Sequence, residues 1–202
     1  MTSSPGLSAM RTPSAARSRC IVLHASSSYS RSPRWTQRDG CPGDRIAHGA
    51  VIPAESLLDL RGLTVVTQPH FVAERGEQYA TGVAADNLPD LWRLGTLSKA
   101  GVSVAGGTDA PYGTEDAWQV MRAAVQRPPL FRADEAISPI RALSLFLGEP
   151  AAPSRQRLVA PGRPADLTLL RAGPLETLRS LTSDLVAATV VGGEIIYADL
   201  QQ

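Results

Sequence analysis

The stretch GVSVAGGTDAPYG, residues 101–113, joins a short apolar run to an acidic side chain. Its residues 102–105 are typical of a buried strand, and Gly101 before them is typical of a helix stop. Asp109 follows this strand after a Gly-Gly-Thr sequence. Because a carboxylate at the end of a buried strand is costly unless a metal, a cation or a substrate compensates its charge, Asp109 is a candidate functional residue. The alternative is an aspartate that caps the next turn.

The segments around this stretch alternate between strand-like and helical patterns. Apolar runs predict strands, and segments with apolar residues at helical spacing or with Pro at their start and Gly at their end predict helices. The expected strands are 45–52, 63–69 and 102–105, and the expected helices are 53–62, 88–101 (with Asn87 as its N-cap) and 115–127. Because parallel βα units show this alternation, we predict an α/β fold over residues 44–127.

The C-terminal part of the chain has a different pattern. Ser138 and Pro139 are well placed as the N-cap and first residue of a short helix that Gly148 ends. After a Pro-rich link, residues 165–170 are strand-like, and residues 185–198 contain two strand-like runs separated by a Gly-Gly pair. Since Gly-Gly suits the two-residue turn between antiparallel strands, we predict a hairpin there.

The composition excludes several classes of partner. The 202-residue chain has a formal net charge of +1, so neither nucleic acid nor an anionic membrane is expected as its main partner. No apolar run approaches the length of a transmembrane helix. Cys20 and Cys41 are the only cysteines and form no C-x-x-C pair, so no disulfide framework or zinc knuckle is expected. We expect a protein of the reducing cytoplasm.

The N-terminal segment, residues 1–43, differs from the rest of the chain. Residues 1–40 are rich in Ser, Arg and Pro, are almost free of acidic residues and show no sustained helical or strand period. This composition predicts a disordered leader. An organellar transit peptide is the alternative, because such peptides are also rich in arginine and poor in acids, but no clear amphipathic face is present.

Three polar residues, His48, His70 and Asp109, follow the three expected strands in turn. In parallel α/β folds, functional side chains gather at the carboxyl ends of the strands. Each of the three is a possible metal ligand or proton carrier, although a single histidine is more often structural. Two histidines and an aspartate at successive strand ends therefore predict a functional site at one edge of the sheet.

Four stretches, in this order, resemble the C-terminal half of an enzyme of the amidohydrolase superfamily. They are DRIAHGAVIPAESLLDLRGLTVVTQPHFVAERGEQY (44–79), LSKAGVSVAGGTDAPYG (97–113), SPIRALSLFLG (138–148) and VAPGRPADLTLL with TVVGGEIIY (159–170 and 189–197). The branch that they resemble most contains N-substituted formamide deformylases and related exocyclic amidohydrolases. The superfamily consists of metal-dependent hydrolases built on a (β/α)8 barrel with a small β-sandwich. The resemblance implies that residues 44–158 are the last three βα units of such a barrel and residues 159–202 part of the sandwich.

The resemblance also implies roles for individual residues. His48 matches a metal-ligand histidine, and Asp109 matches a metal ligand that takes a proton from a metal-bound water and returns it to the leaving nitrogen. A divalent metal, zinc by resemblance, would lower the pKa of that water. His70 is expected to contact the substrate or the loop, and Arg75 and Tyr79 lie on a loop placed to cover a substrate pocket, the alternative being a solvated loop face. The implied substrate is a small amide or formamide whose non-peptide C–N bond is hydrolysed.

Two glycines before Asp109 have an expected role as well. Gly106 and Gly107 are expected to let the backbone approach the site closely. Pro111 is expected to fix the turn that leaves it.

Several parts of the family pattern are missing from this chain. It has no His-x-His pair, since His24 has no second histidine two positions away, and Lys99, its only lysine, lies near the end of an expected surface helix. His48 and Asp109 alone leave a metal short of the three or four protein ligands of a stable site. Three βα units also cannot close an eight-stranded barrel.

We therefore expect a truncated homologue that is weakly active or inactive alone. One alternative is a non-catalytic remnant that pairs its open edges with another copy, as a homo-oligomer, or with an intact relative. The other is a deaminase-type amidohydrolase, because DRIAHG (44–49) is also similar to nucleoside and cytosine deaminases.

Overall fold

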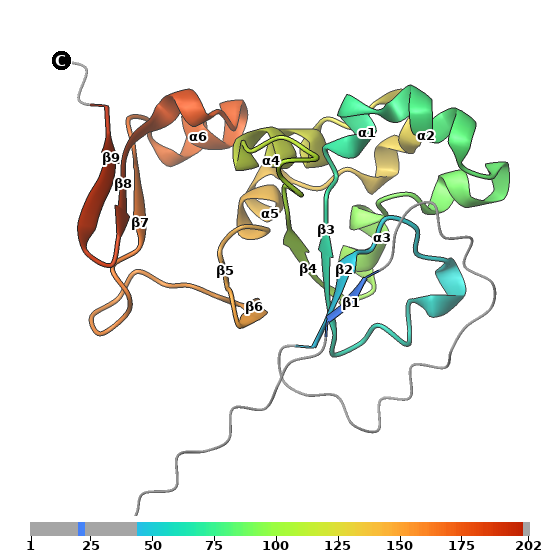
Figure 1. Cartoon of the computed structure of the whole chain (residues 1–202), viewed down its shortest axis with the longest axis horizontal. Helices are drawn as coiled ribbons and strands as arrows, with labels where there is room; N and C mark the ends of the chain where they lie inside the picture. Colours follow the sequence, from blue (N-terminus) through green and yellow to red (C-terminus); the bar gives the residue numbers. More distant parts are fainter. Residues whose placement is uncertain (1–19, 23–43, 200–202) are drawn as a thin grey trace, which may run out of the picture.

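The computed structural model describes residues 20–22 and 44–199 (Figure 1). A four-stranded parallel sheet in the order β1-β2-β3-β4 lies at its centre. The strands are β1 (Cys20–Val22), β2 (Arg45–His48), β3 (Thr64–Thr67) and β4 (Ser103–Gly106). Ile46 of β2 pairs with Val65 of β3, and Val65 pairs with Val104 of β4. The prediction of parallel strands is confirmed, and their carboxyl ends lie at one edge of the sheet.

Strand β1 lies inside the segment that composition predicts to be a disordered leader. Its three residues pair in parallel with the stretch Arg45–Ala47 of β2. The expectation of a structureless leader is therefore wrong for Cys20–Val22, which is an apolar stretch within a Ser- and Arg-rich segment and gains backbone hydrogen bonds by joining the sheet. The rest of residues 1–43 lies outside the described residues.

Short helices connect and cover the strands. They are α1 (Phe71–Glu74), α2 (Gly76–Gly82), α3 (Leu94–Lys99), α4 (Ala117–Val125), α5 (Pro139–Ser144) and α6 (Pro174–Ser180). Helix α4 confirms the helix expected over 115–127. It begins after Asp116, whose carboxylate accepts a hydrogen bond from the Trp118 backbone N–H at 2.8 Å.

Two expected helices differ from the structure. The segment 53–62 forms only a 3-10 turn, Ala54–Ser56, followed by further turns, although Leu60 is buried and Leu57 packs against the same core cluster. The helix expected over 88–101 begins at Leu94. Leu91 forms a β-bridge with Val51 that keeps the chain extended before α3.

The caps expected for two helices also differ. Asn87 is not an N-cap but lies inside the 3-10 helix Ala85–Asp90. Ser138 occupies the N-cap position of α5 with an extended backbone, as predicted, but its side chain makes no capping hydrogen bond.

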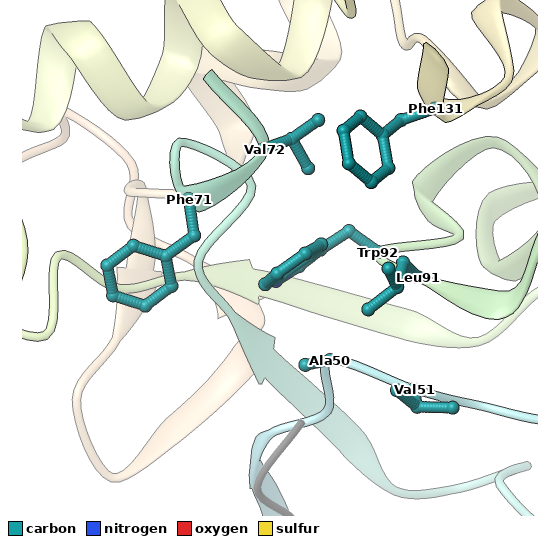
Figure 2. Close-up of a cluster of buried hydrophobic side chains, with 7 residues drawn as sticks. All are labelled: Ala50, Val51, Phe71, Val72, Leu91, Trp92 and Phe131. Carbon is teal, nitrogen blue, oxygen red and sulfur yellow. The ribbon is translucent and has the colours of Figure 1, made fainter. Parts of the chain in front are cut away.

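The core above the sheet is a cluster of apolar side chains from segments far apart in sequence (Figure 2). Its buried members are Ala50, Val51, Phe71, Val72, Leu91, Trp92 and Phe131. Trp92 is 1% exposed, and its ring meets the ring of Tyr79 edge-on at a centroid distance of 4.8 Å. This cluster holds α1 and α2 against the loops that follow β2 and precede α3.

Two charged side chains are buried beside this core. The Arg127 guanidinium donates to the carbonyl oxygens of Phe131, Trp92 and Leu91, and burial lowers the pKa of Arg127 to about 10. Glu135, which has no exposed surface, accepts hydrogen bonds from the Thr96 backbone N–H and hydroxyl in the first turn of α3. Both side chains form hydrogen bonds with backbone groups near the ends of helices and turns. These bonds fix how the loops join the sheet.

The C-terminal part forms two small antiparallel sheets. They contain β5 (Gly148–Glu149) with β6 (Ala152–Gln156), and β7 (Leu167–Leu170) with β8 (Val186–Val191) and β9 (Glu194–Ala198). The hairpin between β8 and β9 confirms the prediction, because Gly192 and Gly193 both have positive φ, 59° and 87°, as a two-residue turn of this kind requires. Figure 1 shows α6 between the three-stranded sheet and α4.

No helix in the part of the chain that the structure describes is both long and apolar enough to cross a membrane.

Candidate functional site

His48 and Asp109 meet at the carboxyl edge of the parallel sheet. His48 is the last residue of β2, and Asp109 follows β4, with β3 between the two strands. His48 Nδ1 lies 3.8 Å from Asp109 Oδ2, and the side chains are 24% and 31% exposed. The pair is therefore close enough for an electrostatic interaction and open enough for a small molecule or ion to reach it.

The backbone at both residues is in the left-handed region. The φ angle of His48 is 69° and that of Asp109 is 53°, and only three other described non-glycine residues have positive φ. This conformation costs free energy for a residue with a Cβ, so the surrounding structure must hold it. For His48, the Thr67 hydroxyl does so in part by donating to the His48 carbonyl oxygen at 2.9 Å.

His70 lies near the pair, but its ring is buried rather than open. It is 1% exposed, packs at 4.4 Å from the Phe71 ring, and neither ring nitrogen has a hydrogen-bond partner among the described residues. Burial lowers the pKa of His70, against the opposing effects of Glu74, the Thr108 backbone and Asp109. The imidazole is therefore neutral near pH 7, and a substrate can reach it only if neighbouring groups move.

The expected substrate loop around Arg75 and Tyr79 is helical. Arg75 lies at the junction of α1 and α2, and Tyr79 lies within α2. The Arg75 guanidinium stacks on the ring of Tyr112, with Cζ 3.6 Å from the ring centroid. Burial raises the pKa of the Tyr79 phenol, whose ring packs on Trp92. Because residues 71–82 bury apolar side chains in the core, this segment is fixed by packing and is not a free loop.

The two glycines before Asp109 have different surroundings. A Cβ at Gly106 would lie 2.6 Å from the Phe146 ring, so this glycine allows close packing of β4 against the chain after α5. A Cβ at Gly107 would meet only the Gln68 amide at 3.3 Å and Val66 at 3.5 Å.

Sequence reasoning did not identify Gly113, although the structure requires a glycine there. A Cβ at this position would lie 2.3 Å from the Thr108 carbonyl oxygen and 2.5 Å from His70 Nε2. In the sequence, the one local feature that indicates a required glycine at position 113 is its place in a Pro-Tyr-Gly turn, four residues after Asp109.

The described residues do not form a complete metal centre. They contain no group of three or more His, Cys, Asp and Glu side chains arranged to hold a metal ion. His48 and Asp109 supply two ligand-type side chains, fewer than the three or four protein ligands of a stable site. The residues present therefore do not fit a metal by themselves.

The model of the amidohydrolase family matches residues 25–197. This chain belongs to the amidohydrolase family. The amidohydrolase chain is 27% identical over 169 residues to putative amidohydrolase YtcJ of Bacillus subtilis (strain 168), a match that covers 76% of this chain and 32% of the relative. The chain thus spans about a third of the length of this curated relative.

Two solved structures are similar to this chain in fold over part of their length. Ochratoxinase of A. niger superposes with a TM-score of 0.55 at 20% identity over 77% of this chain and 37% of the other. Atrazine chlorohydrolase TrzN from Arthrobacter aurescens TC1, solved with zinc, gives a TM-score of 0.51 at 19% identity over 78% of this chain and 38% of the other. The expected resemblance to the amidohydrolase superfamily is confirmed at the level of family and fold.

Proposed function

We propose that this chain supplies part of the active site of a metal-dependent hydrolase that cleaves non-peptide C–N bonds in small amides or formamides. The observation that carries the proposal is the His48–Asp109 pair, 3.8 Å apart at the carboxyl edge of the parallel sheet in an amidohydrolase-family chain. The order of the four motif stretches supports the branch of the N-substituted formamide deformylases, and the zinc in the TrzN structure supports a divalent metal.

In this proposal, β2, β3 and β4 with their connections are the last three βα units of a (β/α)8 barrel, and β7–β9 are part of its β-sandwich. The edge position of His48 and Asp109 supports this arrangement, because functional side chains of parallel barrels lie at the carboxyl ends of the strands.

Asp109 would accept a proton from the water that attacks the substrate carbonyl carbon, and would return it to the leaving nitrogen as the C–N bond breaks. Its carboxylate is partly exposed, so it can exchange a proton with a bound molecule. His48 would act as a metal ligand. Since the described residues supply only these two groups, we propose that further ligands come from polypeptide outside the described residues.

Metal analysis and a hydrolysis assay test this proposal together. We expect zinc to bind the purified 202-residue chain weakly, with loss of binding in His48→Ala and Asp109→Asn and no change in Asp59→Asn, an exposed control. We expect little hydrolysis of a formamide and amide panel by the chain alone.

Two outcomes would correct different parts of the proposal. Retention of one zinc per chain after dialysis, together with turnover, would show that no outside ligands are needed. Zinc binding or turnover that persists unchanged in both Asp109→Asn and His48→Ala would contradict the assignment of the site.

A second candidate is a non-catalytic role through association with another copy of the chain. The incomplete ligand set favours it, as do exposed apolar side chains on the C-terminal sheet, among them Ile195 and Ile196. Sedimentation velocity distinguishes this candidate, because it requires a dimer or larger species at micromolar concentration.

A further inference from the structure

Residues 109–113, here called the Asp109 loop, carry the proposed proton-transfer group away from the end of β4. Inside the loop, the Gly113 backbone N–H donates to the Asp109 carbonyl oxygen at 3.0 Å. The side chain of Tyr112 is 58% exposed, so the loop has little burial of its own to hold it. Because Asp109 has a φ of 53°, its conformation depends on contacts from outside the loop.

Arg75 provides such a contact. Its Nη2 donates to the carbonyl oxygen of Tyr112, and its guanidinium carbon lies 3.6 Å from the centroid of the Tyr112 ring. The same carbon lies 5.1 Å from the Phe71 ring centroid, and the Phe71 and Tyr112 rings meet edge-on at 5.6 Å. One arginine therefore holds both the backbone and the side chain of Tyr112.

Arg75 is itself fixed by the core. Its backbone N–H donates to the Phe71 carbonyl oxygen at 2.9 Å, and its carbonyl oxygen accepts from the Tyr79 N–H at 3.1 Å. Phe71 is 4% exposed and belongs to the buried cluster of Figure 2. The contacts of Arg75 thus connect the exposed Asp109 loop to the buried cluster of Figure 2.

The geometry does not fit the expectation that Arg75 binds substrate directly. Its Nη2 is bonded to Tyr112, its flat face is covered by the Tyr112 ring, and its Nη1 is buried without a hydrogen-bond partner among the described residues. A ligand would have to displace Tyr112 to reach this nitrogen.

We propose that Arg75 is a positioning residue that holds the Asp109 loop against α1 and so sets where the Asp109 carboxylate lies relative to His48. The inference rests on the proposed function of Asp109. Loss of the guanidinium releases Tyr112, and the loop then samples conformations in which the carboxylate no longer faces the imidazole.

Amide hydrogen exchange of the full chain tests the inference without an activity assay. In Arg75→Met, we expect the Gly113 N–H to exchange about tenfold faster, because a charge-assisted hydrogen bond to the loop is lost. Amides of β3 and β4 should keep their rates. Arg75→Lys, which keeps a cation over the ring, should give a smaller increase, and the exposed control Arg179→Met on α6 should give none.

Unchanged Gly113 exchange in Arg75→Met, or an equal acceleration in β3 and β4, overturns the positioning role. A crystal structure of Arg75→Met that keeps the His48–Asp109 distance at 3.8 Å also overturns it.

In any preparation that hydrolyses an amide, Arg75→Met should lower kcat at least tenfold and change KM less than about twofold, since the proton-transfer group and not substrate binding is disturbed. A change confined to KM would instead restore the substrate-binding interpretation. If Asp109→Asn leaves hydrolysis intact while Arg75→Met still accelerates Gly113 exchange, the proposed role of Asp109 is contradicted. The conclusion that Arg75 holds the loop is then still supported.

Discussion

The parallel sheet and the C-terminal three-stranded sheet are built from similar residues but differ in burial. Ile46 of β2 and Val65 of β3 have no exposed surface, because both lie in one buried cluster with Leu60 and Leu97. Ile195 and Ile196 of β9 are 68% and 64% exposed. Apolar, β-branched residues form strands in both regions. The amount of apolar surface that each strand buries depends on which other segments pack on it.

The two regions also differ in the residues that follow their strands. The parallel strands bring His48 and Asp109 to one edge, and the segment after β3 supplies the packed helices that hold the Asp109 loop. The C-terminal sheet is joined to the rest through contacts such as Arg122 Nη1 to the Leu181 carbonyl oxygen and Ser183 Oγ to Asp116 Oδ2. We expect the stability of the chain to reside mainly in the parallel region.

The largest effect is expected from Trp92→Ala. This substitution empties the centre of the cluster above the parallel sheet and should lower the free energy of unfolding by about 3–5 kcal/mol. Leu175→Ala on α6, where the side chain is 73% exposed, should change it by less than about 0.5 kcal/mol. Urea unfolding followed by circular dichroism measures both. Equal losses in the two variants would contradict the comparison.

Gly113→Ala should have the next largest effect. The added Cβ would clash with the Thr108 carbonyl oxygen and the His70 ring, so we expect a loss of about 1–3 kcal/mol. Gly82→Ala is the matched control, because nothing lies within 4 Å of its Cβ position at the end of α2, and alanine there should be neutral or stabilising. Thermal unfolding of both variants measures the change in stability. If Gly113→Ala is as stable as the parent protein, the loop and His70 can move apart to make room for the Cβ.

The part of the pH dependence of stability that comes from histidine should also belong to the parallel region, because no histidine lies in the C-terminal sheet. Burial lowers the pKa of His70 below its ordinary value of 6.5, so the folded chain holds this imidazole neutral. As the pH falls below about 6.5, the unfolded chain takes up a proton that the folded chain does not, and stability is lost down to the folded pKa. His70→Gln should remove this part of the loss in urea titrations at several pH values. An identical pH profile in the variant would mean that His70 titrates equally in both states.

The smallest effect is expected on the exposed strand. Ile196→Thr should change the free energy of unfolding by less than about 0.5 kcal/mol. The same substitution in β2, Ile46→Thr, should cost more than about 2 kcal/mol, since it removes buried apolar contacts and buries a hydroxyl. A large concentration-dependent loss in Ile196→Thr would instead show that β9 is covered by another copy of the chain.

Strong local patterns in the sequence were enough to predict several elements. The strands expected over 45–52, 63–69 and 102–105 are present at 45–48, 64–67 and 103–106, the Gly-Gly pair is a hairpin turn, and the amphipathic segment after Asp116 is a helix. Because parallel strands end at one edge, these patterns also placed His48 and Asp109 on the same side of the sheet before any contact was known. Local spacing suffices for such features, since the period of apolar residues depends only on neighbours along the chain.

Which side chains meet depends on the tertiary structure. Leu91 is held extended by a bridge to Val51, so the helix that its apolar spacing predicts begins at Leu94. Arg75, expected over a substrate pocket, stacks on Tyr112, and His70 is buried against Phe71. These contacts depend on the order of strands and the path of loops between residues far apart in sequence, which no local period encodes. The 3.8 Å separation of His48 and Asp109 across β3 arises in the same way.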